Sequence, residues 1–389
     1  MSSGVMKSEG EWIEMILRAK EIGLSIDEIV DLSLDLAHSG EVIGGWEFPT
    51  ADLASTGGPS SLSTLLVPLH LVEAGCRVPK LGVPGRPAGG VDTLAQIEGY
   101  RTTFSRGEVE RLLPLCRYVH FESGDIFAPA DAATFRLRQE HGCQSVADLA
   151  VASLLSKKVA LAVDMAGLEI RVGRHGNFGA SFSEARVNAR TYMDVAKRLG
   201  LRPICILTDA SVPYQPYVGR GEAIWALSKI FRGEAERWLL AHHEQCAFMA
   251  DEISGKAGSK DIGKLWEIFA INCRYQGGQA NSIHQIADHI SLQHTNFVVS
   301  PSSGFCRYDL ANLRHLLVAA QSKGGSNQYP DTAGVRLLIE PGRRVSKGEP
   351  IMSWRSRTAD ADFLKAGLAD CYAIEDIPAN AAPIEVINE

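Results

Sequence analysis

Apolar residues recur every three or four positions in several segments of the chain, which is the spacing of a helix that buries one face. Residues 11–22 show this pattern first and are followed by Gly23, a residue type that commonly ends helices. In the next segment, Ser25 and Glu28 have the spacing of a capping box, which predicts a helix beginning after Ser25. The same periodicity predicts further helices at 61–74, 130–158 (as two helices), 183–199, 222–231, 234–249 and 262–273.

Short apolar runs rich in β-branched residues lie between these helices and predict buried strands, at 118–121, 159–163, 168–172 and 203–207. Strands that alternate with helices indicate an α/β domain, whose mostly parallel or mixed sheet is covered on both faces. From Thr295 onward the pattern changes to short β-type runs between turn signals, at 296–299, 335–339 and 350–354. This change predicts a small, mostly β terminal domain.

A glycine turn precedes the helix predicted at 61–74. Ser55, Thr56, Gly57 and Gly58 are followed by an apolar run with helical spacing. Such a turn presents several main-chain N–H groups at the positive end of the helix dipole, which suits an anion or an electronegative ligand atom. A glycine turn that only caps a buried helix would have the same pattern, so this stretch alone leaves both interpretations open.

A second group of polar residues lies in the region 130–158. If residues 147–158 are helical, Ser153 and Lys157 share one face, and Arg138 on the preceding helix adds a planar fork of donors. Two cations and a hydroxyl match the edge of a pyrimidine, which displays two carbonyl oxygens and one N–H. The alternative is a surface lysine beside a serine bonded back to its own helix, which spacing alone favours.

Composition narrows the class of protein. At 389 residues the chain should form two or three domains, and 45% hydrophobic with 22% charged residues describes a soluble globular protein. The net charge of −7 disfavours nucleic-acid binding. No apolar run is long enough to span a membrane, and the N-terminus has no apolar signal core, so a cytoplasmic protein is expected. The scattered cysteines are expected to be buried free thiols, and no metal or cofactor is expected.

Several motifs occur in the order found in the thymidine and pyrimidine-nucleoside phosphorylases, which the chain resembles over 27–352. The motifs include S-T-G-G at 55–58, A-P-A-D at 128–131, S-L-L-S-K-K at 153–158 and D-T-A-G-V at 331–335. The resemblance implies a homodimer that acts on a small-molecule pyrimidine nucleoside. It also implies a thymidine-phosphorylase-like α/β fold in three parts. These are a helical domain (1–50 and 130–158), an α/β domain with a mixed sheet (51–129 and 159–294), and a C-terminal β-rich α+β domain (295–389).

The same resemblance assigns a site between the first two domains. The residues that hold the base in the family fall on Arg138, Ser153 and Lys157, and Phe135 takes the place of an aromatic residue that could wall the base. The anion or sugar side would use the loop Ser55, Thr56, Gly57 and Gly58 together with Thr64 and Arg86. The site implied by the resemblance therefore has a base side on one lobe and an anion side on the other.

The anion side departs from the family pattern. Leu53 and Ala54 stand where the family has a Lys-His pair, and Pro84 and Val91 stand where it has two hydroxyl residues. Hydrogen bonds to a charged group contribute roughly 1.5–3 kcal/mol each, so phosphate binding should be weakened. Three hypotheses follow: a glycosyltransferase with reduced phosphate use, a nucleoside hydrolase with Asp92 as its nearest carboxylate, or a non-catalytic nucleoside-binding protein.

Overall fold

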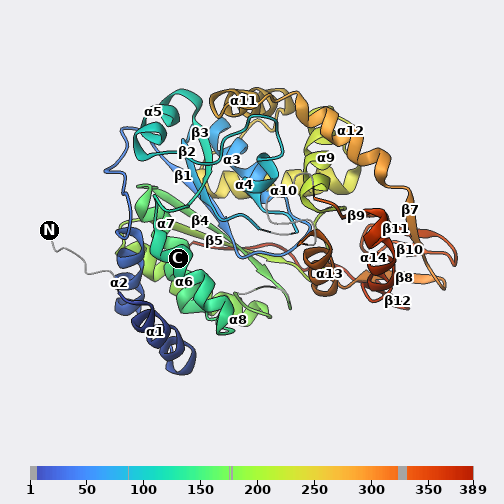
Figure 1. The fold of residues 1–389 in the computed structure, drawn as a ribbon, viewed down its shortest axis with the longest axis horizontal. Coiled ribbons are helices and arrows are strands. Elements are labelled where there is room, and N and C mark those ends of the chain that lie inside the picture. Colours follow the sequence, from blue (N-terminus) through green and yellow to red (C-terminus); the bar gives the residue numbers. More distant parts are fainter. Residues whose placement is uncertain (1–6, 86, 175, 177, 323–330, 389) are drawn as a thin grey trace.

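The computed structural model describes residues 7–85, 87–174, 176, 178–322 and 331–388, and a sheet lies at its centre (Figure 1). The strand order of this sheet is β1-β4-β5-β13. Three of its strands are parallel: β1 (Ala51–Ser55), β4 (Met165–Val172) and β5 (Arg202–Asp209). β13 (Glu385–Ile387) pairs antiparallel with β5, so the sheet is mixed. This architecture confirms the predicted α/β fold class.

A smaller sheet continues the first one beyond β1. It consists of β2 (Val78–Gly82) and β3 (Tyr118–Glu122), which are parallel. A single bridge between Thr50 and Arg77 joins β1 to the start of β2. Because the two strands pair only there, they separate toward their carboxyl ends, which is where the glycine turn follows Ser55.

The helical connections on either side of β1 cover opposite faces of the sheet. α3 (Ser63–Glu73) leads from β1 to β2 and packs in one core with the side chain of Leu53. α8 (Phe182–Arg198) leads from β4 to β5 and packs on the other face with Leu168. The strand order therefore reverses at β1. In open α/β sheets, ligands bind in the crevice that such a reversal leaves at the carboxyl ends of the strands.

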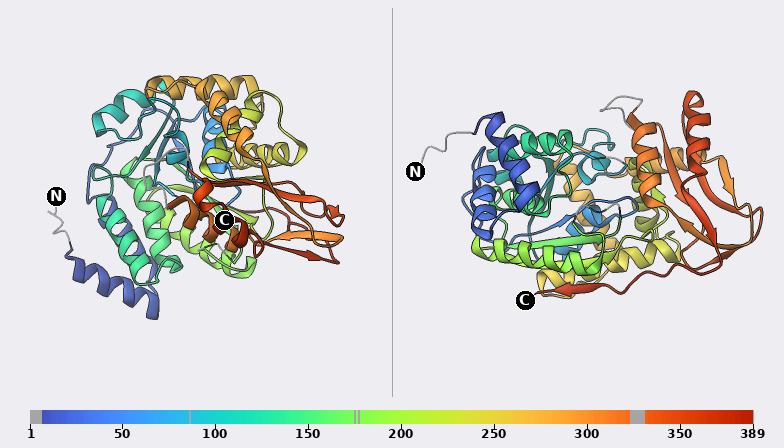
Figure 2. Two further views of the ribbon diagram at one scale, coloured as in Figure 1. Left: turned by 45° about the vertical axis from the view of Figure 1, so that its right-hand side comes forward. Right: turned by 90° about the horizontal axis from the view of Figure 1, so that it is seen from below.

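The helices of the predicted helical domain lie together on the α8 face of the sheet (Figures 1 and 2). Their core is continuous with side chains of β4 and β5, so these helices and that face of the sheet bury one another. The three-part division of the chain stays a prediction. These helices are α1 (Glu9–Ile22), α2 (Ile26–Ala37), α6 (Pro129–Glu140) and α7 (Ala147–Ala160).

A separate core holds the C-terminal elements, which lie at the right of Figure 1. One sheet has the order β6-β9-β11-β7 and another the order β10-β8-β12. Figure 2 shows the last segment running back from this group to the central sheet, where β13 joins β5. The elements of this group are β6 (Tyr217–Val218), β7 (Asn296–Val299), β8 (Gly304–Tyr308), α13 (Leu310–Ser322), β9 (Gly334–Leu337), β10 (Arg344–Val345), β11 (Pro350–Arg355), η1 (Thr358–Asp360), α14 (Ala361–Leu368) and β12 (Tyr372–Glu375).

The remaining helices cover the α3 face and the smaller sheet (Figure 1). α10 packs along α3, and α5 packs on β3. The helices are α4 (Gly90–Leu94), α5 (Arg106–Cys116), α9 (Arg220–Phe231), α10 (Arg237–Ser254), α11 (Ile262–Tyr275) and α12 (Ser282–Gln293).

Local sequence signals are confirmed at some helix ends and wrong at one strand. Ser25 and Glu28 form the predicted capping box at the start of α2. The strand predicted at 159–163 does not form, because Val159 and Ala160 complete α7 and Ala162 takes a positive φ of 50°. Leu161 and Val163 are nevertheless buried, so this apolar run reflects packing at a helix end.

Candidate functional site

The glycine turn lies at the carboxyl end of β1, where the strand order reverses. Gly57 and Gly58 have φ values of 85° and 125°, a region that residues with a side chain rarely adopt. Within the described part of the chain, the main-chain N–H groups of these two glycines donate to no acceptor. The turn therefore keeps two donors for a ligand, close to the start of α3.

A buried ion pair holds this turn from beneath. The guanidinium of Arg171 donates to the Gly58 carbonyl oxygen (3.1 Å) and to Ser63 Oγ (2.9 Å). Glu169 Oε2 in turn accepts from Arg171 Nε at 3.0 Å and from Ser63 Oγ at 2.5 Å. The Thr56 hydroxyl accepts from the main-chain N–H of Arg171 at 3.0 Å. Thr56, predicted as a loop ligand, is thus buried and serves to fix the turn.

The sequence prediction of the site did not include Glu169 and Arg171. They belong to β4 and reach the loop only because β4 pairs with β1. Alternating charges in an otherwise apolar strand, E-I-R within 168–172, were the available signal. A buried charged pair in a strand implies a polar partner on the same face, which here is the loop.

Ser55 and Thr64 are half-buried at the two ends of this loop. Thr64 faces the glycines of the following loop: a Cβ added to Gly90 would lie 3.1 Å from Thr64 Oγ1. The turn, Thr64 and the Gly89-Gly90 turn are thus brought together. Arg86, the other residue predicted for this side, lies outside the described residues.

The predicted base side centres on Lys157. Its ammonium donates to Asp131 Oδ2, to the Ser153 carbonyl oxygen (2.8 Å) and to Ser153 Oγ (3.2 Å). Asp131 is buried, whereas Ser153 is half-buried and its hydroxyl hydrogen stays available. The structure therefore brings Ser153 and Lys157 into contact and adds Asp131, which sequence reasoning did not assign to the site.

Arg138 belongs to the same helix pair but faces the α6–α7 turn. Its guanidinium donates to the carbonyl oxygens of Gln144 (3.0 Å), Leu149 (3.3 Å) and Cys143 (3.4 Å). Burial lowers the pKa of Arg138 from its ordinary value, an effect that nearby Asp131 opposes. Three of its five N–H donors are thus used within the described chain, which leaves two for a ligand. Phe135 is half-buried one turn earlier on α6.

An ion pair between α7 and β1 sets how far along the sheet these two elements lie relative to each other. Lys158 on α7 donates to Asp52 on β1, and both side chains are buried. α7 runs opposite to β1, because its end leads into the start of parallel β4. Ser153 therefore lies about 7.5 Å along α7 from Lys158, and Ser55 about 10 Å along β1 from Asp52, in the same direction. Ser153 and Ser55 therefore lie toward the same edge of the sheet.

The positions that depart from the family pattern have clear structural roles. Leu53 is fully buried in the same core as Ile253, and its side chain lies close to the main chain of Gly167. Val91 is buried, and Pro84 is exposed in the loop after β2. A lysine introduced at position 53 would begin inside an apolar core, so restoring phosphate binding by Leu53→Lys should also destabilise the fold.

Asp92, the carboxylate considered for a hydrolase, is not free. Its Oδ2 accepts from Arg220 Nη1 at 2.8 Å, and Arg220 also pairs with Asp331. All three side chains are buried, and burial raises the pKa of Asp92. A Cβ added to Gly89 would meet Asp92 Oδ1 at 2.2 Å, so this oxygen faces the main chain of its own loop. The carboxylate ties this loop to α9 and to the C-terminal group.

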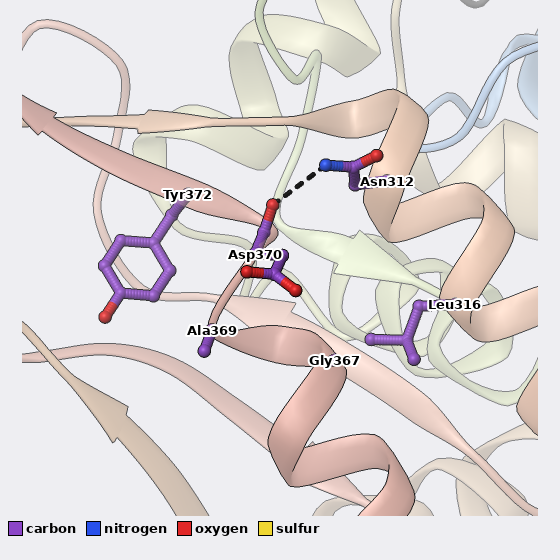
Figure 3. A pocket seen from close by; sticks show the side chains of 6 residues that line it. All are labelled: Asn312, Leu316, Gly367, Ala369, Asp370 and Tyr372. Carbon is purple, nitrogen blue, oxygen red and sulfur yellow. Dashed lines mark hydrogen bonds between the residues drawn. The ribbon is translucent and has the colours of Figure 1, made fainter.

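Two cavities lie away from these residues. One of about 640 Å³ in the C-terminal group is lined by Asn312, Leu316, Gly367, Ala369, Asp370 and Tyr372 (Figure 3). Asn312 Nδ2 donates to the Asp370 carbonyl oxygen at its rim, at 3.0 Å. A second, of about 510 Å³, lies between Glu41 and Arg106. Neither contains a residue predicted for the site.

Three further features of the described residues bear on function. All eight cysteines are buried and free, as expected. No cluster of three metal-binding side chains occurs among residues the structure describes. In that same part of the chain, every helix is too short or too polar to cross a membrane.

Comparisons with known proteins show long, weak similarity to one group of enzymes. Thymidine phosphorylase of Agrobacterium fabrum is 27% identical over 393 residues, covering 95% of this chain and 89% of that protein. Pyrimidine-nucleoside phosphorylase of Geobacillus stearothermophilus is 21% identical, covering 92% and 87%. AMP phosphorylase of Thermococcus kodakarensis is 26% identical, covering 88% and 69%. No family model matches the chain.

Among solved structures, anthranilate phosphoribosyltransferase from Thermus thermophilus aligns with a TM-score of 0.48 and 15% identity. The alignment covers 73% of this chain and 95% of that one.

Proposed function

We propose, from the premise that this chain belongs to the thymidine and pyrimidine-nucleoside phosphorylase family, that it cleaves or forms the N-glycosidic bond of a pyrimidine nucleoside. The observation that carries the proposal is the Asp131–Lys157–Ser153 network beside Arg138. It supplies a half-buried hydroxyl in contact with one cationic group, and a second cationic group lies on the preceding helix.

This arrangement matches a pyrimidine-2,4-dione better than a purine. Such a ring displays acceptor, donor and acceptor along one edge. The two remaining Arg138 N–H groups suit one carbonyl, the Ser153 oxygen suits the ring N–H, and the Lys157 ammonium suits the other carbonyl. Lys157 would exchange its longest bond, 3.2 Å to Ser153 Oγ, for the ligand oxygen.

The same groups would assist bond cleavage. As the glycosidic bond breaks, negative charge develops on the base, and fixed cations nearby stabilise it more in the transition state than in the ground state. The acceptor of the glycosyl group would enter from the side of Ser55, Gly57, Gly58 and Thr64. Because Asp92 is bound by Arg220, a hydrolytic route through that carboxylate is disfavoured.

Ser153→Ala tests the base side with little disturbance, because the side chain is small and half-buried. Uracil is expected to raise the melting temperature of the wild-type protein by mass action. The variant should lose most of this shift, since one hydrogen bond contributes roughly 1 kcal/mol and its loss also frees Lys157 to bond elsewhere. Differential scanning fluorimetry with a uracil titration measures it.

Ser291→Ala on α12 is the matched control, because its hydroxyl also bonds within its own helix. It should retain the wild-type shift. Adenine in place of uracil should give no shift, and a stronger response to adenine would contradict the pyrimidine assignment.

Phosphate is expected to be a poor glycosyl acceptor, because Leu53, Pro84 and Val91 supply no charge or hydroxyl. Phosphate-dependent release of base from thymidine or uridine should stay below about 1 s⁻¹, the low end of ordinary enzyme turnover. Chromatographic product analysis with and without phosphate measures this. Rapid release that saturates at millimolar phosphate would show that the anion side is intact.

The homodimer implied by the resemblance stays a prediction. On α1, the side chains of Leu17 and Ile22 leave 44% and 71% of their surfaces exposed, which such a contact would cover.

A further inference from the structure

Lys80 and His120 lie opposite each other on the two strands of the smaller sheet. The register of β2 and β3 pairs the two residues directly, so their side chains share one face. Both are buried, with 4% and 1% of their surfaces exposed. No role in the site follows from the sequence for either residue.

The Lys80 ammonium fills the space where β1 and β2 separate. It donates to the Leu53 carbonyl oxygen at 2.5 Å and to Asp52 Oδ1 at 2.8 Å. In a continuous sheet, a strand carbonyl is bonded by a main-chain N–H of its neighbour. Here a cation bonds it, two residues and about 7 Å along the strand before Ser55.

Among the described residues, Lys80 shares its carboxylate partner with a second lysine. Asp52 also accepts from Lys158, so two ammonium groups share one carboxylate in a buried cluster. Burial lowers the pKa of Lys158 to about 8. A buried excess of positive charge is unfavourable unless an anion offsets it. Beyond the end of the same strand, the N–H groups of Gly57 and Gly58 have no acceptor among the described residues.

The His120 ring points toward Gly90 and Thr64. Its Nδ1 lies 2.8 Å from the Tyr118 hydroxyl. Its Nε2 lies 3.3 Å from a Cβ built on Gly90, the same point that Thr64 Oγ1 approaches to 3.1 Å. Among described residues Nε2 has no hydrogen-bond partner. When Tyr118 donates to Nδ1, Nε2 carries the hydrogen and is a donor beside Thr64.

We propose that Lys80 and His120 support an oxyanion at the Ser55–Gly58 loop, Lys80 as a positioning charge behind it and His120 as a donor at its rim. The proposal deepens the proposed function and rests on it, since the anion is the glycosyl acceptor or a part of it. It assigns to β2 and β3 the cation and the imidazole that positions 53 and 54 do not supply. Anion binding is thereby retained, although weakened.

Titration calorimetry of the full-length protein with inorganic phosphate, and separately with uracil, tests the proposal. Lys80→Gln removes the charge but keeps a donor toward Leu53 and Asp52. Lys158 still pairs with Asp52, so the fold should persist. Phosphate affinity should fall at least about tenfold, a change of 1.4 kcal/mol, while uracil affinity stays unchanged. Lys80→Arg, which keeps the charge, should restore most of the phosphate affinity.

A second pair of variants tests His120 independently. His120→Phe should weaken phosphate binding several-fold, whereas His120→Asn, which keeps an N–H donor, should weaken it less. Lys264→Met, at an exposed lysine, is the control and should change neither affinity.

The outcomes distinguish a failure of this inference from a failure of the proposed function. If Lys80→Gln binds phosphate as the wild type does, if it loses uracil affinity in parallel, or if the wild type binds no phosphate, the inference is wrong. If phosphate binding depends on Lys80 but uracil does not bind, the inference stands and the proposed function fails.

Discussion

Lys157→Ala is expected to lower the free energy of unfolding by about 3–5 kcal/mol, because it leaves the buried Asp131 carboxylate without its cation. Only 1% of the Asp131 side chain is exposed, so water cannot replace the ammonium. Chemical denaturation followed by fluorescence measures the loss. A simple surface lysine would give a change within about 0.5 kcal/mol.

The double variant Lys157→Met with Asp131→Asn separates stability from binding. It removes both charges together, so much of the lost stability should return, as replacing a whole buried pair is often near neutral. Uracil should still fail to bind, because the ammonium is gone. Recovery of uracil binding in the folded double variant would remove Lys157 from the base side.

The sequence predicts the fold best where local pattern and tertiary packing agree. The helix after Ser25 begins at its capping box, since the signal and the contact lie within four residues. The strand prediction at 159–163 was wrong, because an apolar run with β-branched residues at a buried helix end has the same pattern as a strand. β13 has no such local signal, and it is ordered by pairing with β5 from residues nearly two hundred positions earlier.

Residues of the candidate site are likewise predictable only where they lie close together in the sequence. Ser153 and Lys157 are predictable because they lie four residues apart on one helix, and the structure places them in contact. Asp131, Arg171 and Lys80 reach the site only through strand pairing or helix packing, so spacing cannot reveal them. Each is a charged residue buried in an element that is otherwise apolar or tightly packed.

These buried charges also change the interpretation of the departures at positions 53 and 54. In the sequence, Leu53 and Ala54 supply neither a cation nor an imidazole to the loop. Across the sheet, the next two strands carry Lys80, which bonds the main chain of β1, and His120, which lies near Gly90 and Thr64. In the proposed site, the anion side would therefore use residues from β1 to β4, whereas the base side would use two consecutive helices.

Acid is expected to destabilise this protein steeply, because several histidines are buried in the neutral form. Burial lowers the pKa of His70 to about 3 and that of His242 to about 4. Below the ordinary value of 6.5, the unfolded chain binds protons that the folded chain does not, so stability is full above that pH and falls below it. Between pH 7 and 5 these two residues alone should remove on the order of 4 kcal/mol.

The two rings resist protonation for different reasons, and one variant isolates the contribution of His70. His242 Nε2 accepts the Leu62 N–H at 2.9 Å at the start of α3, so its protonation breaks a contact beneath the loop. The His70 ring nitrogens have no partner among described residues, and its ring lies 5.0 Å from that of His243. His70→Leu should therefore reduce the slope of stability against pH between 6.5 and 4 by nearly one proton. Ser291→Ala, which removes no titratable group, should leave the slope unchanged. Denaturant titrations at several pH values measure these slopes. An unaltered slope in His70→Leu would show that folding does not lower the pKa of His70.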